Sequence, residues 1–154
     1  MTMANSPLAQ LQRTLDAMPP VRAMAVRAMQ TDSGCLRLVA PLAANVNDKG
    51  CAFGGSLSGL MTLAAWAELS LRLHAAGIVA EVYVATCEVA FRAPVYETLV
   101  AEAVLDPDQD WAAILTRLRA RGRARARMSA RIVMADARPG SEMQASFALV
   151  ATAA

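Results

Sequence analysis

The feature that most constrains this chain is a long apolar run over residues 56–76, rich in leucine, alanine and methionine. Such residues favour a helix, and Gly77 supplies its stop. A helix of about 21 residues spans about 30 Å, which is also the thickness of a bilayer core. Glu68, Arg72 and His74 interrupt the run and argue against a membrane span. A helix that is apolar on nearly every side is otherwise buried in a protein interior, so we expect other elements to wrap around it.

Segments suited to this wrapping lie on both sides of the run. Residues 31–34 form a turn cluster between two strand-like runs, which predicts a hairpin, and Ser6 followed by Pro7 begins a short amphipathic helix. Several strands around one long central helix predict an α+β fold in which a curved sheet packs on that helix. The expected elements are a first helix that ends at Pro19 and Pro20, strands over 21–30, 35–40, 81–91, 98–105, 123–135 and 144–150, and a short helix over 110–118, with breaks at Pro94, 106–108 and 138–140.

Length and composition bear on the assembly. The 154 residues are enough for one domain and too few for two ordinary ones, so we expect a single domain over residues 1–154. With 56% hydrophobic and 18% charged residues, the composition excludes a disordered chain. A domain of this size leaves much of its surface exposed, so such an apolar chain is expected to hide more area by self-association. We therefore predict a homodimer or a dimer of dimers.

Cysteine usage and the N-terminal segment bear on location and metal binding. Cys35, Cys51 and Cys87 are odd in number and lie outside any C-x-x-C pattern, which argues against a disulfide framework and favours a reducing cytoplasm. Residues 1–20 lack the continuous apolar stretch of a signal peptide. One histidine and three scattered cysteines do not supply a structural zinc set. We therefore expect a cytoplasmic protein without a bound metal.

The loop before the central helix is the most informative segment for function. Its sequence over residues 47–55 is Asn-Asp-Lys-Gly-Cys-Ala-Phe-Gly-Gly. Paired glycines at a helix start let a ligand approach the backbone closely, because no Cβ intervenes. The helix N-terminus adds unpaired N–H groups and a partial positive charge, which suit a carbonyl oxygen or an anion. Gly54, Gly55 and Ser56 are therefore candidate oxyanion donors.

This loop resembles a known signature. The spacing Asn-x-x-Gly-x-x-Phe-Gly-Gly is similar to the Asn-x-x-Gly-x-x-His-Gly-Gly signature of hotdog-fold acyl-CoA thioesterases, with Phe53 in place of the histidine. The wider context, Phe-Gly-Gly-Ser-Leu before a helix with a tryptophan, resembles in particular the putative thioesterases named after the YiiD C-terminal domain. The resemblance implies a hotdog fold, in which an antiparallel sheet wraps one long helix, and dimers with active sites between subunits. It also implies that Asn47 orders water or substrate, and that Gly54 and Gly55 polarise the thioester carbonyl.

The usual acid of this family is missing. In many members an Asp or Glu nine residues after the motif histidine acts as base or nucleophile, and here that position is Thr62. Thr62 can orient a water, but a hydroxyl is no general base at neutral pH. Two carboxylates remain as candidates: Asp48, which also suits a turn, and Glu68 on the helix, for which pairing with an arginine is the simpler interpretation. Cys51 lacks a nearby histidine and suits a small filler, and His74 suits a helix C-terminus.

Arginines occupy alternate positions in the second half of the chain. Arg121, Arg123, Arg125 and Arg127 alternate with glycine and alanine, which on a strand places all four guanidinium groups on one face. Such a ladder repels itself unless it is solvated or met by anions, so it is either an exposed face or a phosphate site. The segment also resembles the place where hotdog thioesterases meet the nucleotide end of coenzyme A, and an acyl carrier protein would offer an acidic surface. Nucleic acid ranks lower, because only Trp111 among the aromatic residues lies nearby.

Together these features predict an acyl-thioester hydrolase. It acts on acyl-CoA or on an acyl carrier protein thioester by attack of water, without a metal or a separate cofactor, since coenzyme A is part of the substrate. Phe53, Leu57, Met61 and Trp66 either line an acyl tunnel or belong to the core. Two alternatives stay open: a module that binds acyl-CoA or a carrier protein without catalysis, because the acid is missing, and a dehydratase or isomerase of 3-hydroxyacyl thioesters.

Overall fold

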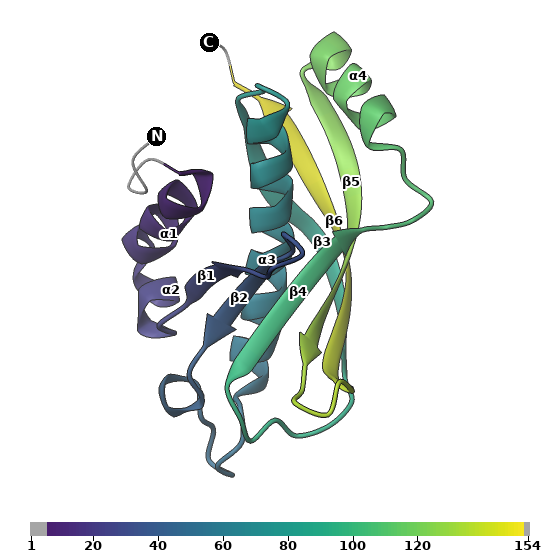
Figure 1. The fold of residues 1–154 in the computed structure, drawn as a ribbon. Helices are drawn as coiled ribbons and strands as arrows, with labels where there is room; N and C mark the ends of the chain where they lie inside the picture. Colours follow the sequence, from purple (N-terminus) through teal and green to yellow (C-terminus); the bar gives the residue numbers. More distant parts are fainter. Residues whose placement is uncertain (1–5, 153–154) are drawn as a thin grey trace.

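One long helix lies against a curved sheet in the computed structural model, which describes residues 6–152 (Figure 1). The elements follow one another as α1 (Pro7–Ala17), α2 (Pro19–Ala23), β1 (Arg27–Gln30), β2 (Leu36–Ala40), the 3-10 helix η2 (Leu42–Ala44), α3 (Gly54–Ala75), β3 (Ala80–Phe91), β4 (Leu99–Leu105), α4 (Trp111–Arg121), β5 (Arg123–Val133) and β6 (Pro139–Ala151).

The strands form one antiparallel sheet of six strands in the order β1-β2-β4-β5-β6-β3. β4 and β5 lie in the middle, and β1 and β3 form the two edges. Strand β5 alternates strictly: Ala124, Ala126 and Met128 are buried on the helix side, and arginines alternate with them on the exposed side. The predicted α+β fold, with an antiparallel sheet wrapped around one long helix, is confirmed.

The central helix α3 is buried along most of its length because its residues are small or apolar on nearly every side. Leu60, Met61 and Leu69 are completely enclosed. Ala76 follows as the C-cap, and Gly77 takes a φ of 66°, the left-handed turn that ends many helices. Among the described residues, no helix combines the length and hydropathy needed to cross a membrane.

The segment before β1 differs from the strand expected over residues 21–30. Pro19 and Pro20 end α1, as expected, but they also begin α2, because a proline in the first turn of a helix needs no N–H donor. Ala25 then turns the chain with a φ of 56°, and the strand begins only at Arg27. α1 packs against α2, β1 and α3 (Figure 1).

The break expected at residues 138–140 is also displaced. The chain reverses at Asp136 and Ala137, whose φ is 67°. The Asp136 carboxylate accepts the backbone N–H of Arg138 and closes the turn, so that Pro139 is the first residue of β6. A strand start is a position where proline is tolerated. β6 is therefore longer than the expected strand over 144–150.

Candidate active site

Asn47 organises the loop that precedes α3. Its side-chain oxygen accepts hydrogen bonds from the backbone N–H groups of Lys49 (2.8 Å) and Cys51 (3.2 Å). Its side-chain amide donates to the Cys51 sulfur at 3.2 Å, which leaves that buried cysteine as a structural partner of the turn. Asn47 thus holds the loop in an Asx-type turn. Its role in ordering water or substrate stays a prediction.

The start of α3 offers backbone donors without a capping side chain. Phe53 is the N-cap residue, and its N–H donates to the Asn45 carbonyl at 2.7 Å, which anchors the helix start. No side chain caps this end, so the N–H groups of Gly54, Gly55 and Ser56 are the donors that the helix leaves unpaired. A Cβ at Gly55 would lie 2.3 Å from Cε1 of Phe53, so the ring position requires glycine. This end of the helix suits a carbonyl oxygen.

Thr62 lies about 12 Å along α3 from Gly54. Its hydroxyl donates to the Ser58 carbonyl at 2.8 Å and lies 3.6 Å from the sulfur of Met143 on β6. Because the hydroxyl proton is used in this way, the oxygen of Thr62 remains free to accept a hydrogen bond. It can orient a water, but it supplies no base.

The two candidate carboxylates are engaged elsewhere. Asp48 is exposed and pairs with Lys49 at 2.9 Å. Glu68 pairs with Arg72 one turn along the helix at 2.7 Å, and it lies about 21 Å along α3 from Gly54. These contacts match the simpler interpretation of each residue, a turn residue and an arginine-bound glutamate. We therefore propose no catalytic role for either carboxylate.

Apolar side chains near the helix fall into two groups. Leu57 and Met61 are enclosed in the core, and Trp66 is half-buried in a groove between α3 and α1. Phe53 and Phe91 are instead 57% and 58% exposed, and the Phe91 ring lies 3.4 Å from the place where a Cβ of Gly54 would stand. His74, the only histidine, is exposed in the last turn of α3, as expected for a cation near a helix C-terminus.

The arginine ladder differs from the expected one at its first position. Gly122 adopts a φ of 68° and ends α4, so Arg121 is the last residue of that helix and does not lie on the strand. Arg123, Arg125 and Arg127 do share the exposed face of β5. The expectation of four guanidinium groups on one strand face is therefore wrong for Arg121.

The arginines also differ in their partners. Arg127 pairs with Asp106 and Asp108. Within residues 6–152, no carboxylate forms an ion pair with the four arginines around a surface hollow of about 410 Å³. The residues that line this hollow are Arg117, Arg121, Arg123, Ala124, Arg125, Ala148, Leu149 and Val150. An unneutralised cluster of this kind suits phosphate groups.

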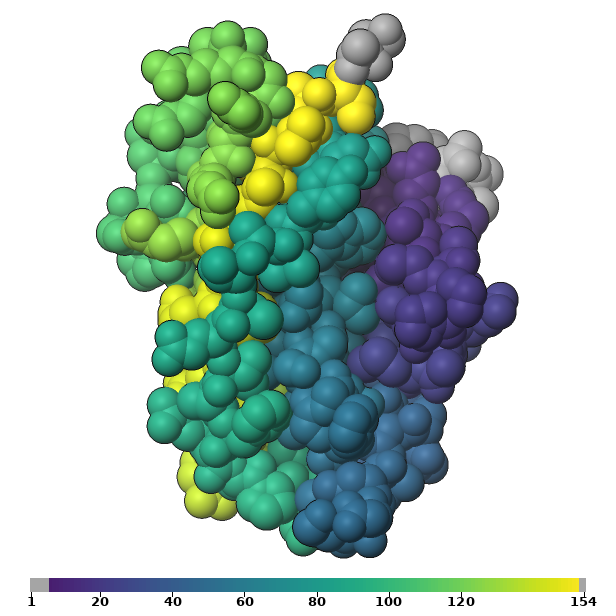
Figure 2. Space-filling model, turned by 180° about the vertical axis from the view of Figure 1, so that it is seen from behind, coloured from purple at the N-terminus to yellow at the C-terminus, as the bar shows by residue number. Residues whose placement is uncertain are grey.

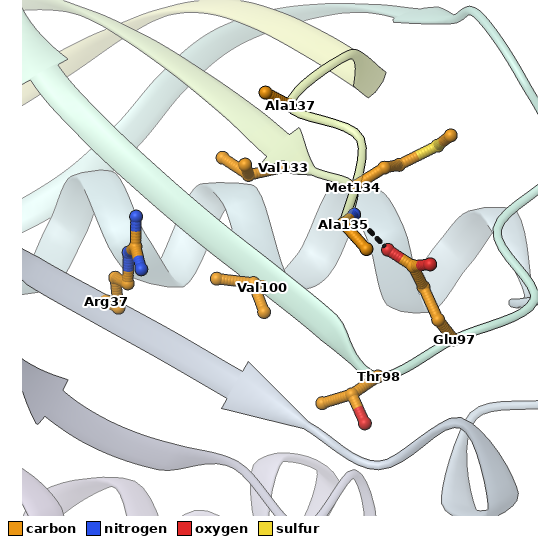
Figure 3. A pocket seen from close by; sticks show the side chains of 8 residues that line it. All are labelled: Arg37, Glu97, Thr98, Val100, Val133, Met134, Ala135 and Ala137. Carbon is orange, nitrogen blue, oxygen red and sulfur yellow. Dashed lines mark hydrogen bonds between the residues drawn. The ribbon is translucent and has the colours of Figure 1, made fainter.

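A larger hollow of about 520 Å³ lies over β4 and the end of β5 (Figure 3). Its charged groups are already paired: Glu97 accepts the N–H of Ala135, and Arg37 donates to Glu102. Burial alone would raise the pKa of Glu102, but hydrogen bonds from Arg37 and Arg131 outweigh it and lower that pKa below its ordinary value. This hollow is therefore not the candidate site. It is lined by Arg37, Glu97, Thr98, Val100, Val133, Met134, Ala135 and Ala137.

Comparison with known proteins identifies the family. The family described as Putative thioesterase (yiiD_Cterm) matches residues 8–151. The chain belongs to this family. The family resemblance drawn from the loop at residues 47–55 is thus confirmed. No curated protein matches the chain.

Several solved structures share the fold of this chain. A protein of unknown function from Chlorobaculum tepidum superposes with a TM-score of 0.84 at 25% identity, covering 93% of each chain. A putative thioesterase from Shewanella oneidensis superposes with a TM-score of 0.82 at 23% identity, covering 94% of this chain and 97% of the other. A Bacillus halodurans protein solved with CoA has a TM-score of 0.68 at 11% identity and covers 99% of each chain. The hotdog fold is therefore shown.

Two polar residues near the start of α3 escaped the sequence interpretation. Asn45 Oδ1 and Ser141 Oγ are buried side-chain atoms without a hydrogen-bond partner among the described residues. The signal for Ser141 was weak: one serine opens an inward row of β6 that otherwise holds Met143, Ala145, Phe147 and Leu149. Within the described part of the chain, no group of three or more His, Cys, Asp or Glu side chains is placed to hold a metal ion.

Proposed function

We propose that this protein hydrolyses acyl thioesters at the start of α3. The observation that carries the proposal is the uncapped helix end behind Gly54 and Gly55, joined to a loop that Asn47 holds in place. Membership in a putative thioesterase family supports it. We also propose that the reaction takes place in the cytoplasm, without a metal or a separate cofactor.

The chemistry requires few groups. The thioester carbonyl oxygen accepts hydrogen bonds from the N–H groups of Gly54, Gly55 and Ser56, and Asn47 and Thr62 place a water near the carbonyl carbon. The water oxygen forms a bond to that carbon, and negative charge collects on the carbonyl oxygen. The C–S bond then breaks, the acyl group leaves as the free acid, and the proton of the water passes to the thiolate sulfur. One oxyanion donor is worth about 3 to 4 kcal/mol in comparable sites.

The arginine hollow supports coenzyme A as the thiol carrier. Arg121, Arg123 and Arg125 lie around it with no carboxylate in an ion pair among the described residues, whereas Arg127 is neutralised. The 3′-phosphate and pyrophosphate of coenzyme A would supply the missing anions. The Bacillus halodurans protein of similar fold was solved with CoA, which supports this proposal. An acyl carrier protein would meet the same arginines with an acidic surface.

We further propose a homodimer formed through the edge strand β3. This strand has twelve residues, lies at the surface beside β6, and exposes Tyr83, Val84 and Phe91 (Figure 2). A long apolar edge is a template for pairing with another strand. Two-fold pairing of β3 with β3 would join two sheets and cover these side chains.

Such a dimer would also shorten the distance between the two parts of the site. Ile132 lies in the same row of the sheet as Phe91, which contacts Gly54, and Arg125 lies about 24 Å farther along β5. Antiparallel pairing turns the second copy end for end. With the two-fold axis at Cys87, the row of the second copy that holds its arginines continues the row of Phe91, so its hollow lies three strand spacings across the sheet, about 14 Å. Mixed dimers test this shared site. One copy carries Asn47→Ala, and the other carries Arg123→Gln and Arg125→Gln. In such a dimer one of the two sites has both an intact Asn47 and intact arginines, so activity should be partly restored.

A second candidate function is favoured by Thr62. The Thr62 hydroxyl donates to Ser58, and no carboxylate takes the place of the family's usual acid. The same site could therefore bind acyl-CoA or a carrier protein without hydrolysing the thioester. Turnover separates the two functions.

The test compares two glycines of α3. Gly55→Ala forces the Phe53 ring away from the helix start and should lower kcat for acyl-CoA at least tenfold. Gly59→Ala is the matched control on the same helix, because the nearest atom to its Cβ is Cε of Met24 at 3.9 Å and the side chain fits. Unchanged kcat in Gly55→Ala would show that the start of α3 is not the reaction site.

A further inference from the structure

Ser141 and Asn45 hold buried polar atoms that lack a hydrogen-bond partner within residues 6–152. Ser141 is 0% exposed and Asn45 is 3% exposed. An unpaired buried donor or acceptor costs about 1 to 3 kcal/mol, so native proteins rarely leave one unpaired. Each atom therefore points to a small polar partner that is not part of the chain.

Both residues lie beside the start of α3. The main-chain oxygen of Asn45 accepts the N–H of Phe53, the N-cap residue of the helix. Ser141 stands directly opposite Phe91 in the β3–β6 ladder, and directly opposite residues face the same side of a sheet. The Phe91 ring in turn lies against Gly54. Both residues are thus linked through one neighbour to the start of α3, an end that no side chain caps.

A second contact limits where the Ser141 hydroxyl lies. Met143 is the next inward residue of β6, about 7 Å along the strand, and its sulfur is 3.6 Å from the hydroxyl of Thr62. Phe91, which pairs with Ser141 across the sheet, contacts Gly54, and Met143, in the next row, contacts Thr62. Ser141 therefore faces the part of α3 that runs from the oxyanion donors to the position of the missing acid.

We propose that Ser141 is a positioning residue whose hydroxyl holds the water that attacks the thioester; this rests on the hydrolysis proposed above. Ser141 is fully enclosed and its hydroxyl has no partner among the described residues, so water is the only reactant small enough to bond to it. The Thr62 oxygen, whose proton goes to Ser58, accepts one hydrogen of this water, and Ser141 Oγ forms the second hydrogen bond. Two fixed hydrogen bonds orient a lone pair of the water toward the carbonyl carbon. These hydrogen bonds orient the water, as the absent carboxylate does in other members of the family. They do not accept its proton, so no residue acts as the base.

The test uses Ser141→Ala, with Ser146→Ala as the matched control. Ser146 lies on the opposite face of the same strand, where its hydroxyl bonds to Thr86 at 2.9 Å. The assay measures kcat and KM for acyl-CoA, and the ratio of hydroxamate to free acid when hydroxylamine competes with water. Ser141→Ala should lower kcat about tenfold, the equivalent of one hydrogen bond, and leave KM unchanged.

The product ratio distinguishes positioning from a structural role. Loss of the held water should shift the ratio about tenfold toward hydroxamate, whereas a smaller folded fraction changes the amount of both products equally. The melting temperature should stay close to that of the wild type, because the Ser141 hydroxyl bonds to no other residue in the described part of the chain. A wild-type protein that hydrolyses thioesters, with a Ser141→Ala variant of equal kcat and equal product ratio, overturns this inference alone. A wild-type protein without hydrolysis overturns the proposed function and this inference with it.

Discussion

Neutralising Arg123 and Arg125 should weaken binding of acyl-CoA and leave cleavage of the thioester bond intact. Both guanidinium groups lie on the exposed face of β5, and no carboxylate among the described residues forms an ion pair with either. Two unit charges 4 Å apart in water interact with about 1 kcal/mol, so the loss of two arginine–phosphate contacts costs about 2 kcal/mol. Since 1.4 kcal/mol is a factor of ten, KM for acyl-CoA should rise about 30-fold in the double variant Arg123→Gln, Arg125→Gln.

The assay compares acyl-CoA with the same acyl group on N-acetylcysteamine, which has no phosphate. The 30-fold rise should appear only with acyl-CoA, and it should shrink in 1 M salt, where the Debye length is about 3 Å. Arg131→Gln is the control, because Arg131 lies on the same strand but is paired with Glu102. An equal rise for both thioesters, or no rise for either, would refute the assignment of the phosphate site.

Three further predictions concern the loop, the missing acid and the sheet. Thr62→Asp should raise kcat about 100-fold by supplying a base, and it should add an acidic limb to the pH–rate profile. The neutral control Thr62→Asn should do neither. A folded Thr62→Asp variant with lower kcat would contradict the assigned place of the water. Asn47→Ala should lower kcat more than Asn47→Asp, because aspartate keeps the acceptor for the N–H groups of Lys49 and Cys51; unchanged kcat in Asn47→Ala would remove this residue from the site. Burial raises the pKa of Glu102, but the hydrogen bonds from Arg37 and Arg131 outweigh it, so the folded pKa lies below that of the unfolded chain. The ion pairs of Glu102 therefore stabilise the fold above the pKa of the unfolded chain, and this stabilisation is lost as pH falls through the folded pKa. Glu102→Gln should lower the melting temperature at neutral pH and match the wild type in strong acid. Equal melting temperatures at neutral pH would show that the ion pairs contribute nothing.

Local patterns in the sequence predicted most of the fold correctly. The apolar run that forms α3, the turn at residues 31–34 and the alternation along β5 each depend on residues close together in the chain. The errors arose where one residue type permits two structures. Pro19 and Pro20 suit both the end of one helix and the first turn of the next, and the alternation at Arg121 is overridden by the left-handed turn at Gly122.

The candidate site was likewise predictable from the sequence only in part. The motif residues Asn47, Gly54 and Gly55 are adjacent in sequence, so the loop could be recognised from its spacing alone. The contact between the Phe53 ring and Gly55 is local but depends on a side-chain rotamer. The sequence marks Ser141 only weakly, as one serine in an apolar row, because its place depends on the pairing of β6 with β3, fifty residues earlier in the chain.

Hydrolysis itself is tested most directly by the loss of thioester absorbance when purified protein is mixed with a panel of acyl-CoAs. This readout is preferable to a thiol reagent, because Cys35 and Cys87 are exposed and would react with such a reagent. We predict turnover of at least one acyl-CoA, with free acid and coenzyme A formed in equal amounts. Tight binding of acyl-CoA without turnover anywhere in the panel would contradict the thioesterase and identify the chain as a binding module.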